Sequence, residues 1–296
     1  MSKKAVIVIG SNSTRCVTAD FEAPDSTAQR RRVETRLFLH MRDERLAEDA
    51  ISDTVSGIRK LAAEAGAPVL GIYATSAVRD AQNADALSFA IQSACGLPLT
   101  VLSGEEEAAA SFYGAAGNKP AGMIDIGGGS TEIAIGEGMR VQAAVSLQLG
   151  ASRLFAAHPV NDPQDVTAAL NAASAACRDL PEVLVSHKDI QHFYSVGGTG
   201  TACACLAQGL SRKKAQVEGF LLRRDTIYRH LLSVAAVPRE QRAAIPGFPA
   251  SRIDILPTGM AILIAVMDRL SLSTVTVTER TNGDGLLRML AEQKSS

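Results

Sequence analysis

Tryptophan is absent from this sequence, and aromatic residues together make up only 4% of its 296 positions. Long hydrophobic runs are missing too: the longest, at residues 259–267, is about half the length that a membrane-spanning helix requires. The apolar stretch at residues 6–9 is short and no small-residue cleavage site follows it, which argues against a signal peptide. We therefore expect a cytoplasmic protein with no membrane partner.

Cysteine is scarce, and the five residues present form no Cys-x-x-Cys pair. Cys203 and Cys205 are one residue apart, but no cluster of cysteine or histidine partners lies nearby in the sequence. Small buried thiols are therefore favoured over a metal site, and we expect all five cysteines to be reduced.

An excess of one charge sign is also missing, since 30 Lys+Arg against 31 Asp+Glu leave a formal net charge of −1. This balance argues against a polycation that binds nucleic acid non-specifically, and no DNA partner is expected. One modest basic cluster joins residues 212–214 to Arg223 and Arg224. A solvated helix face is the default interpretation, and a track for a long polyanion is the alternative.

The length predicts about two domains, and strands mix with helices throughout. In the first domain we expect strands at 4–9, 14–21, 32–39, 69–74 and 99–102, and helices at 47–65, 83–96 and 103–117. Asn83 is the expected cap of the second helix, and Ser103 with Glu106 forms a capping box for the third.

The second domain is expected to hold strands at 123–126, 131–135, 192–196 and 274–278. Asp162 and Pro163 predict the start of a helix there, and a final helix follows residues 282–283. The expected domains are residues 1–118, completed by a C-terminal helix at 285–296, and residues 119–284.

An internal repeat is the most informative feature. Residues 6–14 (VIVIGSNST) match residues 123–131 (MIDIGGGST), each an apolar strand, a glycine-led turn ending in Ser-Thr, and the start of a second strand. Glycine-rich turns present backbone N–H groups that can hold phosphate oxygens. An ordinary tight hairpin explains either turn alone, but two matching turns and a third glycine-rich loop at 197–201 favour phosphate binding. The repeat suggests two similar domains that face each other across a cleft.

Several stretches, taken together, resemble the exopolyphosphatase/guanosine pentaphosphate phosphatase (Ppx/GppA) family. They are residues 10–13, 74–83, 103–107, 124–132, 197–199 and 252–254, followed by Gly259. The resemblance implies two ribonuclease H-like α/β domains of the actin, sugar kinase and heat-shock ATPase superfamily flanking a cleft. It also implies a short form without the extra C-terminal domains of longer relatives. The implied activity is release of a terminal phosphoryl group from inorganic polyphosphate or pppGpp with a divalent cation such as Mg²⁺. A homodimer is a further expectation from the family.

The resemblance also implies roles for individual residues. Glu107 is the expected base that activates water. The alternative for Glu107, and the interpretation we adopt for Glu105 and Glu106, is that these carboxylates complement the positive end of the helix that they open. Asp125 and Glu132 are the expected metal ligands, with a solvated strand residue as the alternative for Glu132.

Contacts to phosphate or substrate are expected from a larger set: Gly10, Ser11, Asn12, Ser13, Arg15, Arg79, Gly127, Gly128, Gly129, Ser130, Gly197, Gly198, Thr199 and Arg252. For Arg15 and Arg79 the alternative is a structural ion pair, with Asp80 or another carboxylate in the case of Arg79. Arg252 is expected toward the distal end of the substrate.

Three positions depart from the family pattern. Val8 stands where the family has an aspartate, Ala109 where it often has an arginine, and residues 281–285 read Thr-Asn-Gly-Asp-Gly in place of Gly-Leu-Arg-Glu-Gly. These changes leave the scaffold patterns intact and weaken the inference of activity. The alternative function is a diverged, weakly active or inactive regulatory protein that binds polyphosphate or an alarmone. A small-molecule kinase is a third, less favoured class, because residues 74–80 and the triple glutamate are not kinase signatures.

Overall fold

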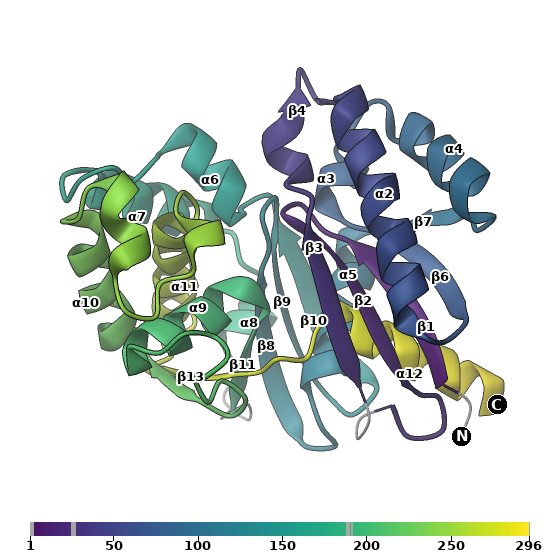
Figure 1. Ribbon diagram of the computed structural model, residues 1–296. Helices are drawn as coiled ribbons and strands as arrows, with labels where there is room; N and C mark the ends of the chain where they lie inside the picture. The colour runs from purple at the N-terminus through teal and green to yellow at the C-terminus, as the bar shows by residue number, and fades with distance from the viewer. Residues whose placement is uncertain (1–2, 25–27, 188–189, 191, 296) are drawn as a thin grey trace. The chain divides into compact units, whose positions relative to one another are not determined.

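The computed structural model describes residues 3–24, 28–187, 190 and 192–295 (Figure 1). The chain divides into two compact units. Unit 1 is Met1–Gly114 with Thr281–Ser296, and unit 2 is Ala115–Arg280. Within the described residues, no helix combines the length and the apolar character needed to cross a bilayer.

Unit 1 is built on a five-stranded sheet in the order β3-β2-β1-β6-β7. The first three strands are antiparallel, and β6 and β7 run parallel to β1. The strands are β1 (Lys3–Ile9), β2 (Ser13–Asp20), β3 (Gln29–Glu34), β6 (Val69–Ala74) and β7 (Leu99–Val101). A separate two-stranded ribbon joins β4 (Met41–Arg42) and β5 (Arg45–Leu46).

Helices cover both faces of this sheet (Figure 1). On one face, α2 (Glu48–Ala65) and α4 (Ala84–Cys95) pack on alternate strand residues such as Ile7 and Ile72. On the other, α5 (Gly104–Ala115) and the C-terminal α12 (Asn282–Ser295) pack on Val6 and Val17. Burial on both faces explains why β1 reads as an unbroken apolar run rather than an alternating one.

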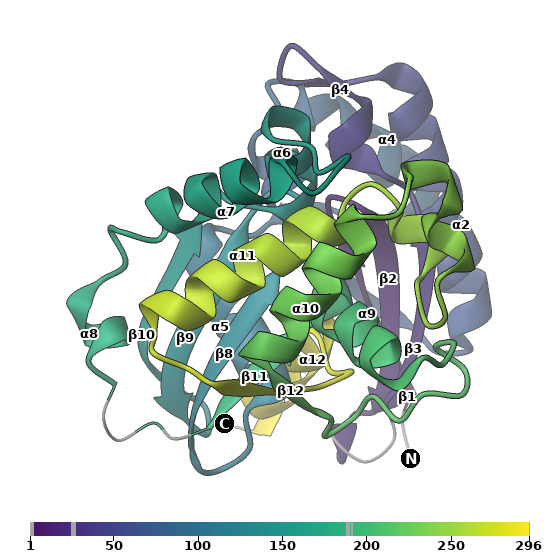
Figure 2. The same cartoon turned by 90° about the vertical axis from the view of Figure 1, so that its left-hand side faces the viewer.

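Unit 2 has a six-stranded sheet in the order β10-β9-β8-β11-β13-β12. The strands are β8 (Pro120–Ile126), β9 (Thr131–Glu137), β10 (Arg140–Leu147), β11 (Phe193–Val196), β12 (Leu221–Arg223) and β13 (Thr274–Val277). Its helices are α6 (Ala151–Ala157), α7 (Asp165–Ala176), α8 (Glu182–Val185), α9 (Gly197–Gln208), α10 (Arg224–Ala235) and α11 (Leu256–Arg269). Helix α11 lies between α7 and α10 (Figure 2), and the hydrophobic run noted in the sequence forms its buried length.

The repeat in the sequence is a repeat in the structure. In both sheets the first strand has the second on one side and a parallel fourth strand on the other. Counted in chain order without the β4–β5 ribbon, the strand order is 3-2-1-4-5 in unit 1 and 3-2-1-4-6-5 in unit 2. The turns also match: Gly10 donates to the Ser13 carbonyl, and Gly127 donates to the Ser130 carbonyl, both at 3.0 Å. The predicted fold class of two similar ribonuclease H-like α/β domains is confirmed, and the cleft between them stays a prediction.

Some element predictions were wrong. The strand expected at 32–39 ends at Glu34; Arg36 then adopts φ 45° and residues Leu37–His40 form a 3-10 helix. The helix expected from Asp162 begins only at Asp165. In the preceding turn the Asp162 carboxylate accepts the Gln164 amide, and the Asp165 carboxylate accepts the amides of Asn161 and Asp162.

Two further differences lie at helix starts. Residues 197–201 are the first turns of α9 and not a loop. Asn83 occupies the N-cap position of α4, but its side chain bonds the amide and carbonyl of Leu46 and makes no capping bond. The Ser103–Glu106 capping box is confirmed, with reciprocal bonds of 2.8 and 3.1 Å. Strand β10 and the short β4, β5 and β12 were not predicted.

Candidate phosphate-binding and catalytic site

The carbonyl oxygens of Ser11 and Asn12, in the turn between β1 and β2, accept hydrogen bonds from elsewhere in unit 1. The Ser11 carbonyl accepts the Phe38 amide at 2.9 Å, and the Asn12 carbonyl accepts the Arg36 amide at 3.0 Å. Over the described part of the chain, the amides of Ser11 and Asn12 donate to no acceptor. The backbone groups that this turn offers to a ligand are therefore donors, which is the property of an anion-binding nest.

Side chains of the same turn serve the scaffold. The hydroxyls of Ser11 and Ser76 lie 3.0 Å apart, and Asn12 donates from Nδ2 to Glu34 at 3.0 Å. Since these side chains already make hydrogen bonds within the protein, the phosphate contacts expected from residues 11 and 12 would come from their backbone amides.

The turn between β8 and β9 repeats this arrangement with different partners. Amides in the first turn of α6 donate to the carbonyls of Gly127 and Gly128 at 2.9–3.0 Å, and Arg153 donates from Nε to the Gly129 carbonyl at 2.7 Å. Among the described residues, no acceptor pairs with the amides of Gly128, Gly129 and Ser130. Both glycine turns thus present uncommitted donors, as phosphate binding requires.

Glu107 lies in the first turn of α5 and is 6% exposed. Its Oε2 is 3.1 Å from Nη1 of Arg79, which also donates to the Leu102 carbonyl at 2.8 Å. The ion-pair alternative for Arg79 is therefore realised with Glu107 and not with Asp80. The guanidinium fixes the direction of the carboxylate expected to act as the base.

Contacts connect Glu107 to the first glycine turn within unit 1. The Ser11 hydroxyl contacts the hydroxyl of Ser76, the first residue of the short helix α3 (Ser76–Arg79). The last residue of that helix, Arg79, forms the ion pair with Glu107. The stretch at residues 74–83 is thus the bridge between the turn and the candidate base.

Asp125 and Glu132 are paired directly opposite each other on β8 and β9. Both are buried, at 7% and 1% exposure, and Glu132 accepts a 2.7 Å hydrogen bond from the Ser146 hydroxyl. The solvated alternative for Glu132 is therefore wrong. Like charges at directly opposed positions destabilise a strand pair, and a cation between them offsets that cost.

These two carboxylates fit a divalent cation with oxygen ligands. Over the described ranges, no three or more histidine, cysteine, aspartate or glutamate side chains are grouped to hold a metal ion. A cation here would take two protein carboxylates and fill its other positions with water and phosphate oxygens, as Mg²⁺ commonly does.

The start of α9 lies against this acidic pair. A Cβ atom on Gly197 would be 2.6 Å from Oδ1 of Asp125, and one on Gly198 would meet the Arg252 guanidinium. Gly197 also has φ +84°, so the position requires glycine for both reasons. Asp125, Gly197, Gly198 and Arg252 are therefore brought together in unit 2. Thr199 is fully buried and lies against Gly259, so the structure leaves no exposed atom of this residue for the expected ligand contact.

Other charged residues singled out in the sequence serve the scaffold. Arg212 pairs with Glu279, and Arg224 pairs with Asp268 at 2.8 Å. These ion pairs favour the solvated-face interpretation of the basic cluster over a polyanion track.

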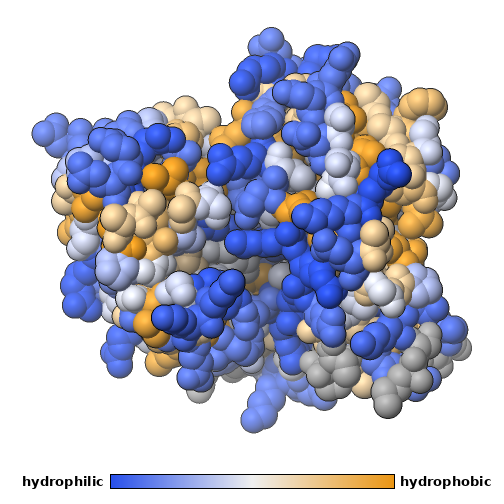
Figure 3. Space-filling model, viewed as in Figure 1, coloured by the Kyte–Doolittle hydropathy of each residue, from blue (hydrophilic) through white to orange (hydrophobic). Residues whose placement is uncertain are grey.

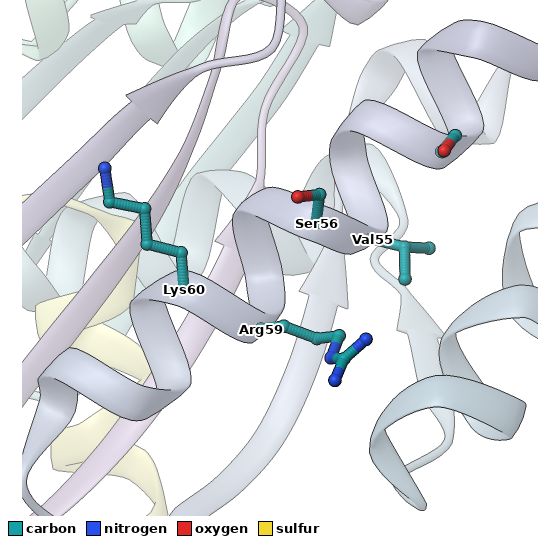
Figure 4. A pocket seen from close by; sticks show the side chains of 5 residues that line it. Val55, Ser56, Arg59 and Lys60 are labelled. Carbon is teal, nitrogen blue, oxygen red and sulfur yellow. The ribbon is translucent and has the colours of Figure 1, made fainter.

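Two pockets on unit 1 involve none of the predicted site residues. One of about 480 Å³ runs along α2 (Figure 4), where the Arg59 and Lys60 side chains diverge and cannot converge on one anion. The other, of about 290 Å³, is mainly apolar and lies where α2, α4 and the sheet meet. Hydrophobic side chains also gather over α4 (Figure 3), where Phe89 is 76% exposed.

All five cysteines are free thiols, as expected. Burial raises the pKa of Cys203 to about 12 and that of Cys177 to about 11. Cys203 is therefore protonated at neutral pH and does not act as a metal ligand or nucleophile.

Several residues that support the site were missed in the sequence. Ser76, Glu34, Ser146 and Arg153 act through contacts with residues 14 to 65 positions away. The matched stretch at 74–83 was the only sequence signal that could have indicated one of them, Ser76.

Two sheets that share the strand order 3-2-1-4, each with a glycine turn after its first strand, define the class: a two-domain α/β protein built from ribonuclease H-like units. The model of one family, the Ppx/GppA phosphatase family, matches residues 26–293. The chain belongs to the Ppx/GppA phosphatase family.

Named relatives agree with this assignment. The chain is 30% identical over 230 residues to the guanosine-5'-triphosphate,3'-diphosphate pyrophosphatase of Vibrio atlanticus, and 32% identical over 232 residues to that of Pseudoalteromonas atlantica. Each match covers 75% of this chain but 45% and 44% of the relative, so the chain spans less than half the length of these relatives.

Solved structures share the fold over nearly the full chain. An exopolyphosphatase-like protein has a TM-score of 0.90 at 25% identity, covering 100% of this chain and 99% of that one. An exopolyphosphatase from Cytophaga hutchinsonii has a TM-score of 0.85 at 22% identity, covering 99% and 98%. An Aquifex aeolicus PPX-GPPA enzyme has a TM-score of 0.78 at 24% identity, covering 97% and 99%.

Proposed function

We propose that this protein is a metal-dependent hydrolase that releases terminal orthophosphate from inorganic polyphosphate, pppGpp or both. The observation that carries the proposal is the chain of contacts from Ser11 through Ser76 and Arg79 to Glu107. It couples an anion-binding turn to a buried, oriented carboxylate. Names of the relatives support both substrate classes, because some are called pppGpp pyrophosphatases and others exopolyphosphatases.

In this proposal the turn amides bind phosphate oxygens, and Arg15 and Arg252 neutralise negative charge on the substrate. Glu107 accepts a proton from the attacking water, which must lie within hydrogen-bond reach of the carboxylate. Phosphoryl transfer depends mainly on such positioning and charge stabilisation. The hydrogen bonds that fix the carbonyl groups of both glycine turns therefore contribute directly to the rate.

Asp125 and Glu132 would hold the divalent cation in unit 2. When bound, Mg²⁺ supplies charge neutralisation to phosphate oxygens. The Ser146 hydroxyl fixes one oxygen of Glu132, and the bare backbone of Gly197 leaves room for the Asp125 carboxylate.

Orthophosphate release from polyphosphate and from pppGpp, by the wild type and by Glu107→Gln, tests the proposal. We expect the substitution to lower kcat about 10²- to 10⁴-fold, because the general base is lost. Glu106→Gln is the matched control, since Glu106 is a neighbour committed to the capping box. A chelator should stop release and added Mg²⁺ should restore it. Equal rates of orthophosphate release by the wild type and Glu107→Gln would refute the proposed hydrolase.

A second function is favoured by one observation: Val8 stands at the strand position that Asp125 occupies in the second copy of the repeat, and it is 3% exposed in an apolar cluster. On this alternative the protein is a diverged regulator that binds polyphosphate or an alarmone with little turnover. Tight binding of either polyanion without orthophosphate release would favour it. In either case we expect a cytoplasmic protein that forms a homodimer. Size-exclusion chromatography with light scattering would test the oligomeric state.

A further inference from the structure

Equivalent rows of side chains cross the first three strands of both sheets, one residue pair away from each glycine turn. In unit 2 the row is Asp125 on β8, Glu132 on β9 and Ser146 on β10. It contains two carboxylates and a hydroxyl, which is chemistry suited to a cation.

In unit 1 the corresponding row is Val8 on β1, Arg15 on β2 and Arg32 on β3. Val8 takes the place of Asp125, and Arg15 takes the place of Glu132. The unit 1 row therefore has no acidic member and two cations. Directly opposed residues have Cβ atoms about 4.5–5.5 Å apart, and two like charges at that spacing are destabilising. An anion between the two guanidinium groups reverses the sign of this interaction.

Contacts within unit 1 direct both arginines toward the first glycine turn. Nε of Arg15 lies 3.4 Å from the hydroxyl of Ser13, the last residue of that turn. Nε of Arg32 lies 3.5 Å from Glu34, whose other oxygen accepts the Asn12 side chain. Arg32 is also 49% exposed, so a solvent-borne ligand can reach it.

The neighbouring arginines of β3 do not share these properties. Arg31 is paired with Cys16, so it points to the opposite face of the sheet. Arg30 shares a face with Arg32 but donates to Asp284 of α12 in a two-pronged ion pair. Of the three consecutive arginines, Arg32 is the one opposite Arg15, and among the described residues its ion pair is with Glu34 of its own strand.

We propose that Arg32 and Arg15 form an anion subsite in unit 1 for a phosphoryl group adjacent to the one held by the first glycine turn. The ligand class is a chain of phosphoanhydride-linked phosphates, either inorganic polyphosphate or the 5'-polyphosphate of a nucleotide. This inference rests on the proposed function and deepens it, because it gives unit 1 a role in holding substrate where unit 2 holds the cation.

Equilibrium binding in a Glu107→Gln background tests the subsite without turnover. The probes are medium-chain inorganic polyphosphate, pppGpp and orthophosphate, and the added substitutions are Arg32→Ala, Arg32→Lys and Arg31→Ala. Arg31→Ala is the matched control, since it removes the same charge from the same strand on the opposite face.

We expect Arg32→Ala to weaken binding of a polyphosphate chain about 3- to 10-fold, the range for a partly exposed charge contact. Arg32→Lys should recover part of the loss, and Arg31→Ala should stay within twofold. Orthophosphate binding should not change, because a single phosphate occupies the turn. Loss with both polyanions supports the adjacent subsite, because both ligands have a second phosphoryl group next to the terminal one. Loss with inorganic polyphosphate alone would place Arg32 further along the chain and overturn the adjacent position.

Equal weakening by Arg32→Ala and Arg31→Ala would overturn the inference, because net charge alone would explain it. No effect of Arg32→Ala on either polyanion would overturn it as well, while leaving the proposed hydrolysis intact. Conversely, Arg32-dependent binding by a wild type that releases no orthophosphate would support the subsite and refute the hydrolase.

Discussion

Val8 stands where the second copy of the repeat has Asp125. It packs in an apolar cluster with Val6, Val17 and Ala110, directly opposite Arg15. A carboxylate introduced there would be buried but beside a guanidinium, so part of its desolvation cost would be offset.

We therefore predict that Val8→Asp raises metal-dependent orthophosphate release about tenfold and lowers the free energy of unfolding by about 1–3 kcal/mol. Phosphate release with and without chelator, together with thermal unfolding, measures both effects. The matched control is Val6→Asp, on the same face but two residues farther from the turn and opposite Val17. It should destabilise more and accelerate nothing. An unchanged rate in a folded Val8→Asp protein would mean that another group has replaced the carboxylate.

The cysteines allow a prediction about pH. Because burial raises the pKa of Cys203 to about 12, roughly one thiol in ten thousand is a thiolate at pH 8. We expect iodoacetamide to spare Cys203 and Cys177 in the native protein, with their labelling rising as the pH approaches those values. Cys95 is partly exposed and should be labelled first.

Peptide mass spectrometry after timed labelling measures this, and Cys95→Ser should remove most of the native-state signal. Rapid native labelling of Cys203 at pH 8 would contradict the buried position of its thiol.

Residue roles were predictable where a local pattern carried them. The capping box and the repeated turns could be read because each involves neighbours in the sequence. The partner of Arg79 could not, because Glu107 is 28 residues away and only the packing of α3 beside α5 selects it over the adjacent Asp80. The same holds for Glu132, whose partner Ser146 lies on a strand that was not predicted.

At the scale of elements, α5 and α12 approach each other unusually closely. A Cβ atom on Gly285 would overlap the Ala110 carbonyl, and one on Gly114 would overlap the Thr281 carbonyl. The segment 281–285 is therefore a site of close packing between the two helices as well as the start of α12. It also carries Asp284, which holds Arg30.

We predict that Gly285→Ala lowers the free energy of unfolding by about 1–3 kcal/mol or more, because the backbones must separate. Gly117→Ala is the control, since nothing lies within 4 Å of its Cβ position, and it should stay within about 0.5 kcal/mol. Urea unfolding followed by circular dichroism gives both values. Equal stability of the two variants would refute the close packing of α5 on α12.

The predicted boundaries of helices and strands were wrong where tertiary contacts override the local hydrophobic pattern. Residues 35–39 continue the apolar character of a strand, yet Arg36 turns left-handed so that the amides of Arg36 and Phe38 can bond the first glycine turn. Strand β10 has mixed polarity with no strong alternation, and its pairing with β9 selects it. Neither interaction is visible in a window of sequence.

At the scale of the molecule, the chain passes from unit 1 to unit 2 and back. Helix α12 supplies Leu286 and Leu287 to the cluster that also contains Val6 and Val8. We predict that truncation after residue 280 exposes this apolar face and removes the cooperative unfolding of unit 1, whereas truncation after Ala291 does not.

Limited proteolysis and thermal unfolding of the two shortened proteins measure the difference. Protection of β1 and β2 from proteolysis after the longer truncation would show that unit 1 does not need the helix.

The return of α12 to unit 1 sets an order for biosynthesis. Residues 115–280 form one continuous stretch and can fold as soon as they emerge, whereas the first 114 residues must wait for their last helix. At 5–20 residues per second, a ribosome takes about 8–33 s to make the intervening 166 residues. During that interval α5 alone covers one apolar face of the nascent amino-terminal sheet, and the part that α12 will bury stays exposed, the kind of surface that chaperones recognise.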